Sequence, residues 1–86
     1  EVHMRPEVEA ETSLNVLYDT IYGGGLGQLT VRPVSYYSYR ITSKANGKAT
    51  LISGDLVDKY IDGSLEDSNA AKKEITGIFE KLRESN

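Results

Sequence analysis

The sequence predicts an α+β domain of order α-β-β-β-α, a two-layer sandwich in which two helices cover one face of a three-stranded antiparallel sheet. Two segments, one toward each end of the chain, repeat apolar residues at the 3.6-residue period of a helix. Between them, residues 29–53 concentrate β-branched and aromatic residues together with turn signals. Each predicted helix has one apolar stripe, and burying both stripes against the sheet gives the two layers.

The first helix is predicted around Leu14, Leu17, Tyr18 and Ile21, which fall at i, i+3, i+4 and i+7. Alternation over the same segment also permits a strand, but Leu17 and Ile21 would then face water. The helix should stop at residues 23–25, three glycines that adopt a left-handed C-terminal cap without a Cβ penalty.

Three strands are predicted next, over residues 29–34, 36–42 and 48–53. A proline lacks the N–H that a central strand needs, so Pro33 either places the first strand at a sheet edge or ends it. Asn46-Gly47 predicts a type I′ hairpin turn between the other two strands, because both central residues of that turn need positive φ.

The region after the third strand has two interpretations. Leu56–Ile61 fits either one helical turn capped by Asp55 or a further strand that ends at Gly63. The last helix is predicted from its apolar face, with Asp67 or Ser68 as its N-cap. That face consists of Ala71, Ile75, Ile78, Phe79 and Leu82.

Size and composition indicate one small globular domain. Of the 86 residues, 38% are hydrophobic and 27% are charged, and we expect a flexible terminus at residues 1–8 followed by a domain at residues 9–86. Met4 could be the natural initiator, with residues 1–3 added in front of it. Equally, the chain could be a domain cut from a larger protein. The absence of cysteine excludes disulfides, thiol catalysis and thiolate metal sites.

The chain shows no secretory signal and no apolar run of the roughly 18 residues that span a membrane. We therefore expect no membrane partner. An intracellular location is favoured, although the compartment stays unknown.

Charge is distributed unevenly along the chain, which has a formal net charge of −3. Both ends are acidic, whereas residues 23–53 contain no acidic residue and four basic ones, Arg32, Arg40, Lys44 and Lys48. A positive sheet segment between negative helices predicts either a polyanionic partner, through phosphate contacts, or a solubilising sheet surface.

Catalysis, metal binding and cofactor binding are not predicted, so we expect no enzyme. His3 is the only histidine, and no Ser-His-Asp or Cys-His arrangement is present. The glycines of residues 23–27 follow a helix and lack the Lys-Ser/Thr pair of a phosphate loop, so they indicate a flexible turn. A group of five carboxylates lacks calcium-loop spacing and fits a solvated surface: Asp55, Asp58, Asp62, Glu66 and Asp67.

Three tyrosines, Tyr36, Tyr37 and Tyr39, are spaced along the second predicted strand. Side chains alternate between the faces of a strand, so at least one ring should lie on each face. A ring on the inner face is core, and a ring on the outer face beside Arg40 would be placed to stack on bases or to anchor a partner protein.

The element order and a few residues resemble a double-stranded-RNA-binding domain over about Ser13 to Leu82. Residues 13–18 are similar to the family's first helix, which contacts a minor groove, and residues 60–64 to its third strand and following turn. Residues 68–73 are similar to the lysine-bearing start of its second helix, which grips phosphates.

The chain departs from that family's pattern in three ways. Asn69 and Ala70 stand where the family has its leading lysines, and its Gly-Pro-x-His loop between the first two strands is missing. Acidic residues that would repel RNA lie in or beside the second helix: Glu66, Asp67 and Glu74.

The resemblance implies a non-catalytic module that binds double-stranded RNA weakly and by shape. Residues on both helices and the hairpin would carry the binding: Asn15, Asp19, Lys44, Lys48, Lys72 and Lys73. Two alternatives stay open. A protein-interaction or dimerisation domain, homodimers included, would use exposed tyrosines or a helix face. A meander-plus-helix DNA-binding arm domain would insert the sheet into a major groove, with Arg32 and Arg40 reading bases.

Overall fold

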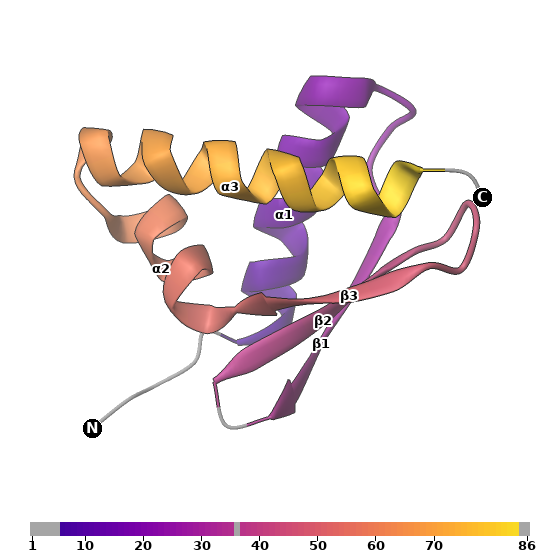
Figure 1. Cartoon of the computed structure of the whole chain (residues 1–86), viewed down its shortest axis with the longest axis horizontal. Helices are drawn as coiled ribbons and strands as arrows, with labels where there is room; N and C mark the ends of the chain where they lie inside the picture. Colours follow the sequence, from indigo (N-terminus) through magenta and orange to yellow (C-terminus); the bar gives the residue numbers. More distant parts are fainter. Residues whose placement is uncertain (1–5, 36, 85–86) are drawn as a thin grey trace.

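The computed structural model describes residues 6–35 and 37–84, and it has the predicted α+β architecture. The order is α-β-β-β-α-α, because a third helix lies between the sheet and the last helix. The elements are α1 (Glu7–Tyr22), β1 (Leu29–Ser35), β2 (Ser38–Ser43), β3 (Ala49–Ser53), α2 (Gly54–Asp62) and α3 (Leu65–Arg83). The strands form one antiparallel sheet in the order β1-β2-β3. Helices α1 and α3 cross on the same side of this sheet, and α2 lies beside the start of α3 (Figure 1).

Helix α1 confirms the helical interpretation of the first apolar segment. Ala10, Leu14 and Leu17 on its inner face are buried. The helix stops where the glycines predict, with Gly23 at φ 78° and its N–H bonded to the Asp19 carbonyl oxygen at 2.8 Å. It begins at Glu7, so residues 7 and 8 are helical, and residues 1–5 of the expected flexible terminus lie outside the described residues.

The sheet confirms the predicted meander. Pro33 lies in an edge strand, and this strand continues to Ser35 rather than ending at the proline. Strand β2 begins at Ser38 rather than at residue 36, so Tyr37 belongs to the turn between β1 and β2, and Tyr36 lies outside the described residues. Alternation then places one set of side chains in the core, namely Leu29, Val31, Tyr39, Ile41 and Ile52.

The hairpin between β2 and β3 is confirmed, but its predicted type I′ turn is wrong. Five residues, 44–48, connect the strands, and among the described residues only glycines have positive φ. Gly47 takes φ 74°, and its N–H donates to the Ser43 carbonyl oxygen at 2.8 Å. Asn46 instead uses its side chain, which donates to the Leu82 carbonyl oxygen and accepts from the Lys48 N–H, each at 3.0 Å.

Leu56–Ile61 is helical, as part of α2, which settles the choice between helix and strand. The predicted cap at Asp55 is wrong, because Ser53 fills that role. The Ser53 hydroxyl accepts a hydrogen bond from the Asp55 N–H at 3.1 Å, which satisfies a donor that the first helical turn leaves unpaired.

Helix α3 begins earlier than predicted. The Ser64 hydroxyl accepts from the Asp67 N–H at 3.1 Å, so Ser64 is the N-cap, and the predicted caps Asp67 and Ser68 lie within the helix. The apolar face of α3 is confirmed, with Ala71, Ile75, Phe79 and Leu82 buried and Ile78 packed against the core.

Aromatic residues join the two long helices over the sheet. The Tyr18 ring meets the Phe79 ring edge-on with 5.1 Å between centroids, and Tyr18 also accepts a hydrogen bond from Arg83 at 3.1 Å. The Arg83 guanidinium lies 4.0 Å from the centroid of the Tyr22 ring, a cation–π distance. These contacts hold the C-terminal part of α3 on α1. None of the helices in the described part of the chain is long and apolar enough to cross a bilayer.

Candidate nucleic-acid interface

One face of the sheet is covered by helices and the other is uncovered. We call the uncovered side the open face and define it by the residues that alternate with the core: Thr30, Arg32, Ser38, Arg40, Thr42, Ala49, Leu51 and Ser53. None of the eight is acidic. The face is therefore a short, positive β-surface on a protein of negative net charge.

Two arginines lie directly opposite one another at the centre of the open face. Arg32 on β1 pairs with Arg40 on β2, and Arg40 pairs in turn with Leu51 on β3. Like charges in directly opposed positions destabilise a sheet. The two opposed guanidinium groups therefore cost folding energy, and both are exposed. An anionic ligand that binds between them would remove their mutual repulsion.

Glu7 neutralises only part of this charge. Its carboxylate lies 3.6 Å from the Arg32 guanidinium, and both side chains are well exposed, so solvent screens the pair. No ion pair of Arg40 occurs within residues 6–35 and 37–84. Arg40 is consequently the less neutralised of the two arginines.

Asn15, one of the predicted RNA contacts, is a structural residue here. Its side chain is only 5% exposed and is held between α1 and β1. The amide nitrogen donates to the Leu29 carbonyl oxygen at 3.1 Å, and the amide oxygen accepts from the Leu29 N–H at 2.9 Å. Asp19, also predicted as a contact, accepts from the Gly25 N–H at 2.8 Å and orders the glycine turn.

The predicted lysines fall into two separate groups. Lys44 and Lys48 lie at the hairpin, where the Lys48 ammonium donates to the Glu84 carbonyl oxygen at 2.9 Å. Lys72 and Lys73 lie twelve and eleven residues before Glu84 on the exposed side of α3. At a rise of about 1.5 Å per residue, roughly 18 Å of helix separates Lys72 from Glu84. The structure does not bring the six predicted residues together.

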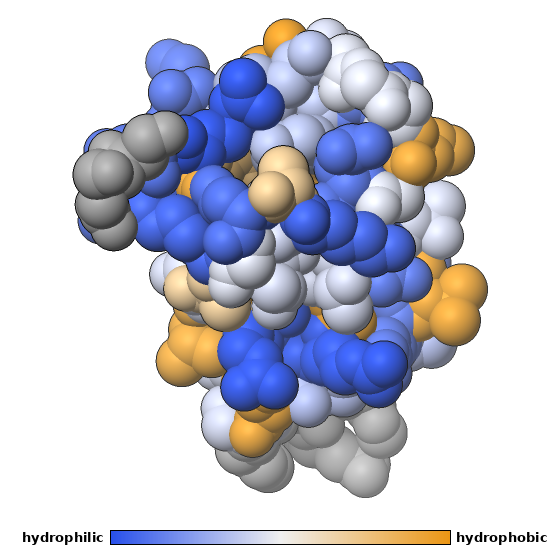
Figure 2. Space-filling view, turned by 90° about the vertical axis from the view of Figure 1, so that its right-hand side faces the viewer, coloured by the Kyte–Doolittle hydropathy of each residue, from blue (hydrophilic) through white to orange (hydrophobic). Residues whose placement is uncertain are grey.

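The two ends of α3 also differ in charge, so the two groups of lysines lie in different electrostatic surroundings. Its first turn carries Glu66 and Asp67, which interact favourably with the positive end of the helix dipole and would repel phosphates. Its last turn, with Lys81 and Arg83, lies at the same end of the molecule as the hairpin, where hydrophilic residues dominate the surface (Figure 2).

The tyrosines take structural positions in the described residues. Tyr39 is fully buried beneath the helices. Tyr37 packs against Gly54 and donates to the Asp58 carboxylate at 2.8 Å. That hydrogen bond, with some desolvation, raises the pKa of Tyr37 to about 12. Tyr36, the third tyrosine of this prediction, lies outside the described residues.

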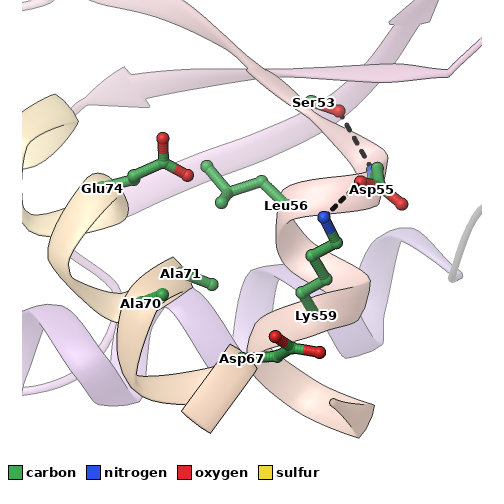
Figure 3. Close-up of a pocket in the computed structure, with 8 residues that line it drawn as sticks. All are labelled: Ser53, Asp55, Leu56, Lys59, Asp67, Ala70, Ala71 and Glu74. Carbon is green, nitrogen blue, oxygen red and sulfur yellow. Dashed lines mark hydrogen bonds and ion pairs between the residues drawn. The ribbon is translucent and has the colours of Figure 1, made fainter. Parts of the chain in front are cut away.

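A groove between α2 and α3 forms a second feature of the surface (Figure 3). Three carboxylates line it, Asp55, Asp67 and Glu74, and Lys59 lies 3.4 Å from the Asp55 carboxylate. The groove therefore has a negative balance of charge. In the described residues, no three His, Cys, Asp or Glu side chains gather closely enough to hold a metal ion.

Sequence reasoning missed the direct pairing of the two arginines, because that pairing depends on an irregularity in the strand. Ser35 pairs with Ser38, and counting outward evenly from that pair would place Arg32 opposite Ile41. The register shifts by one residue between Pro33 and Ser35, so Arg32 instead faces Arg40. Comparison of the chain with protein-family models, with curated proteins and with solved structures gave no match.

Proposed function

We propose that this domain binds double-stranded DNA, with the open face of its sheet in the major groove. The observation that carries the proposal is the cross-strand pair of Arg32 and Arg40 on a sheet without acidic residues. Arginine pairs bidentately with guanine edges and with phosphates, so the same two side chains can position the protein and contact bases.

The dimensions of the open face favour DNA over RNA. Neighbouring strands lie about 4.8 Å apart, so three strands span about 10 Å. The major groove of B-DNA is about 12 Å wide, whereas the major groove of A-form RNA is too narrow for side chains to enter. The minor-groove mode expected for double-stranded RNA would need Asn15, which is occupied with Leu29.

Binding should be weak and sensitive to salt. Arg32, Arg40 and the exposed Lys44 can contact phosphates, so the slope of log K against log salt should be no steeper than about −2.7, at 0.9 per contact. Glu7 competes with DNA for Arg32, so Glu7→Gln should tighten binding.

The test is fluorescence anisotropy at low and at physiological salt, with labelled DNA and RNA duplexes of the same sequence and about 16 base pairs. Two double variants are compared, Arg32→Glu with Arg40→Glu and Lys72→Glu with Lys73→Glu, which change the net charge equally. We expect the arginine variant to lose about tenfold or more in DNA affinity and the lysine variant to lose far less.

Equal losses in the two variants would show that net charge, not the open face, governs binding, and would overturn the proposal. Tighter binding of the RNA duplex, abolished by the lysine variant, would instead favour the double-stranded-RNA hypothesis.

A further inference from the structure

The two edges of the sheet differ in how their backbone groups are satisfied. On the β1 edge, the Asn15 amide pairs with both the N–H and the carbonyl of Leu29. The Glu11 carboxylate accepts from the Val31 N–H at 3.2 Å. Pro33, the next outward position, has no N–H. Side chains of α1 and a proline therefore block this edge against another strand.

The β3 edge has no such cover. The Ser43 N–H donates to the Lys48 carbonyl oxygen at 2.8 Å, which fixes the alternation of the β2-β3 ladder. Ala49 and Leu51 consequently direct their N–H and carbonyl groups away from β2. Within residues 6–35 and 37–84, these outward N–H and carbonyl groups have no hydrogen-bond partner. Leu51 is also 58% exposed.

We infer that a second copy of the chain pairs with β3, antiparallel and centred on Leu51, to form a continuous six-stranded sheet. A two-fold axis at Leu51 makes the contact self-complementary. Ala49 then faces the partner's Ser53, and Leu51 faces the partner's Leu51. The strand Ala49–Ser53 contains neither a charge nor a proline to prevent pairing.

Charge complementarity supports a second copy as the occupant of this edge. In the centred register, the partner's Lys48 lies opposite Gly54, at the end of β3 where the groove between α2 and α3 begins. The side chain of residue 48 lies on the same face of the sheet as those of Thr50 and Ile52. This is the face that the helices cover, and the groove lies on the same side.

The groove presents an excess of carboxylate, from Asp55, Asp67 and Glu74, to that incoming lysine (Figure 3). Lys48 is available for this contact, because its ammonium has three donors and uses one on the Glu84 carbonyl. The two-fold axis produces the same lysine-carboxylate contact at the other end of the interface.

A single cysteine tests the register directly, because the chain has none of its own. Directly opposed, hydrogen-bonded residues of antiparallel strands have Cα atoms about 5.5 Å apart, within the roughly 4.4–6.8 Å that disulfides span. We expect Leu51→Cys to form a disulfide-linked dimer under mild oxidation without nucleic acid. The matched control is Val34→Cys, an exposed position on the blocked β1 strand, which should stay monomeric.

Sedimentation equilibrium provides a second measurement without oxidation. The unmodified protein should show a concentration-dependent monomer-dimer equilibrium, which Leu51→Lys abolishes and Val34→Lys leaves intact. Glu74→Lys should weaken the dimer without touching the strand. A protein that stays monomeric at all concentrations, or equal cross-linking of the two cysteine variants, would overturn the inference.

Discussion

The two faces of one sheet carry opposite kinds of side chain, although the same three strands supply both. The covered face contributes Tyr39, Ile41 and Ile52 to the core, whereas the open face presents Arg32 and Arg40 to solvent. Burial dictates the residues of the covered face. The arginine pair on the open face contributes nothing to folding stability. Its two residues are therefore better explained by a requirement of binding than by a requirement of folding.

The largest expected effect is on the covered face. Phe79→Ala removes a fully buried ring that contacts Tyr18, and it should lower the free energy of unfolding by about 3–5 kcal/mol. The matched change on the open face, Leu51→Ala, truncates an exposed side chain and should cost the monomer, compared at concentrations below dimerisation, no more than about 0.5 kcal/mol. Urea unfolding measures both, and comparable losses would contradict the assignment of the two faces.

A smaller effect is expected where α1 blocks the β1 edge. Asn15→Ala leaves the buried N–H and carbonyl of Leu29 without partners, so the free energy of unfolding should fall by about 1–3 kcal/mol. Thr12→Ala, an exposed change on the same helix, is the control and should be close to neutral. An Asn15→Ala variant as stable as this control would mean that Asn15 does not secure the edge.

The smallest effect should have the opposite sign. Arg40→Thr removes the repulsion between directly opposed arginines and should raise the free energy of unfolding by about 0.2–1 kcal/mol at low salt. High salt screens exposed charges, so the gain should shrink there. Arg40→Lys, which keeps the charge, serves as the control. A loss of stability in the threonine variant would show that Arg40 supports the fold.

The sequence was sufficient to predict the class, the meander and the apolar faces of the two long helices, because periodicity and glycine positions are local signals. It was ambiguous at Leu56–Ile61, where a short apolar run fits a helix or a strand. The caps at Ser53 and Ser64 were missed because several polar residues precede each helix, and only the backbone geometry selects one.

The candidate site was harder to predict because it depends on contacts between distant segments. Nothing local indicates that Asn15 pairs with Leu29, fourteen residues away, so it looked like an accessible polar residue on a helix. The lysines looked like one group because the sequence does not show that the hairpin reaches the C-terminal end of α3. The charge pattern along the sequence located the positive segment. Only the strand register shows that Arg32 and Arg40 lie side by side on one face of the sheet.

The most direct test of the open face as the binding surface is an NMR titration of labelled protein with a DNA duplex at low salt. The account predicts salt-sensitive shifts at the amides of Thr30, Arg32, Arg40 and Thr42, with little change along the exposed side of α3. Shifts concentrated at Lys72, Lys73 and Thr76, with the sheet amides unmoved, would contradict it.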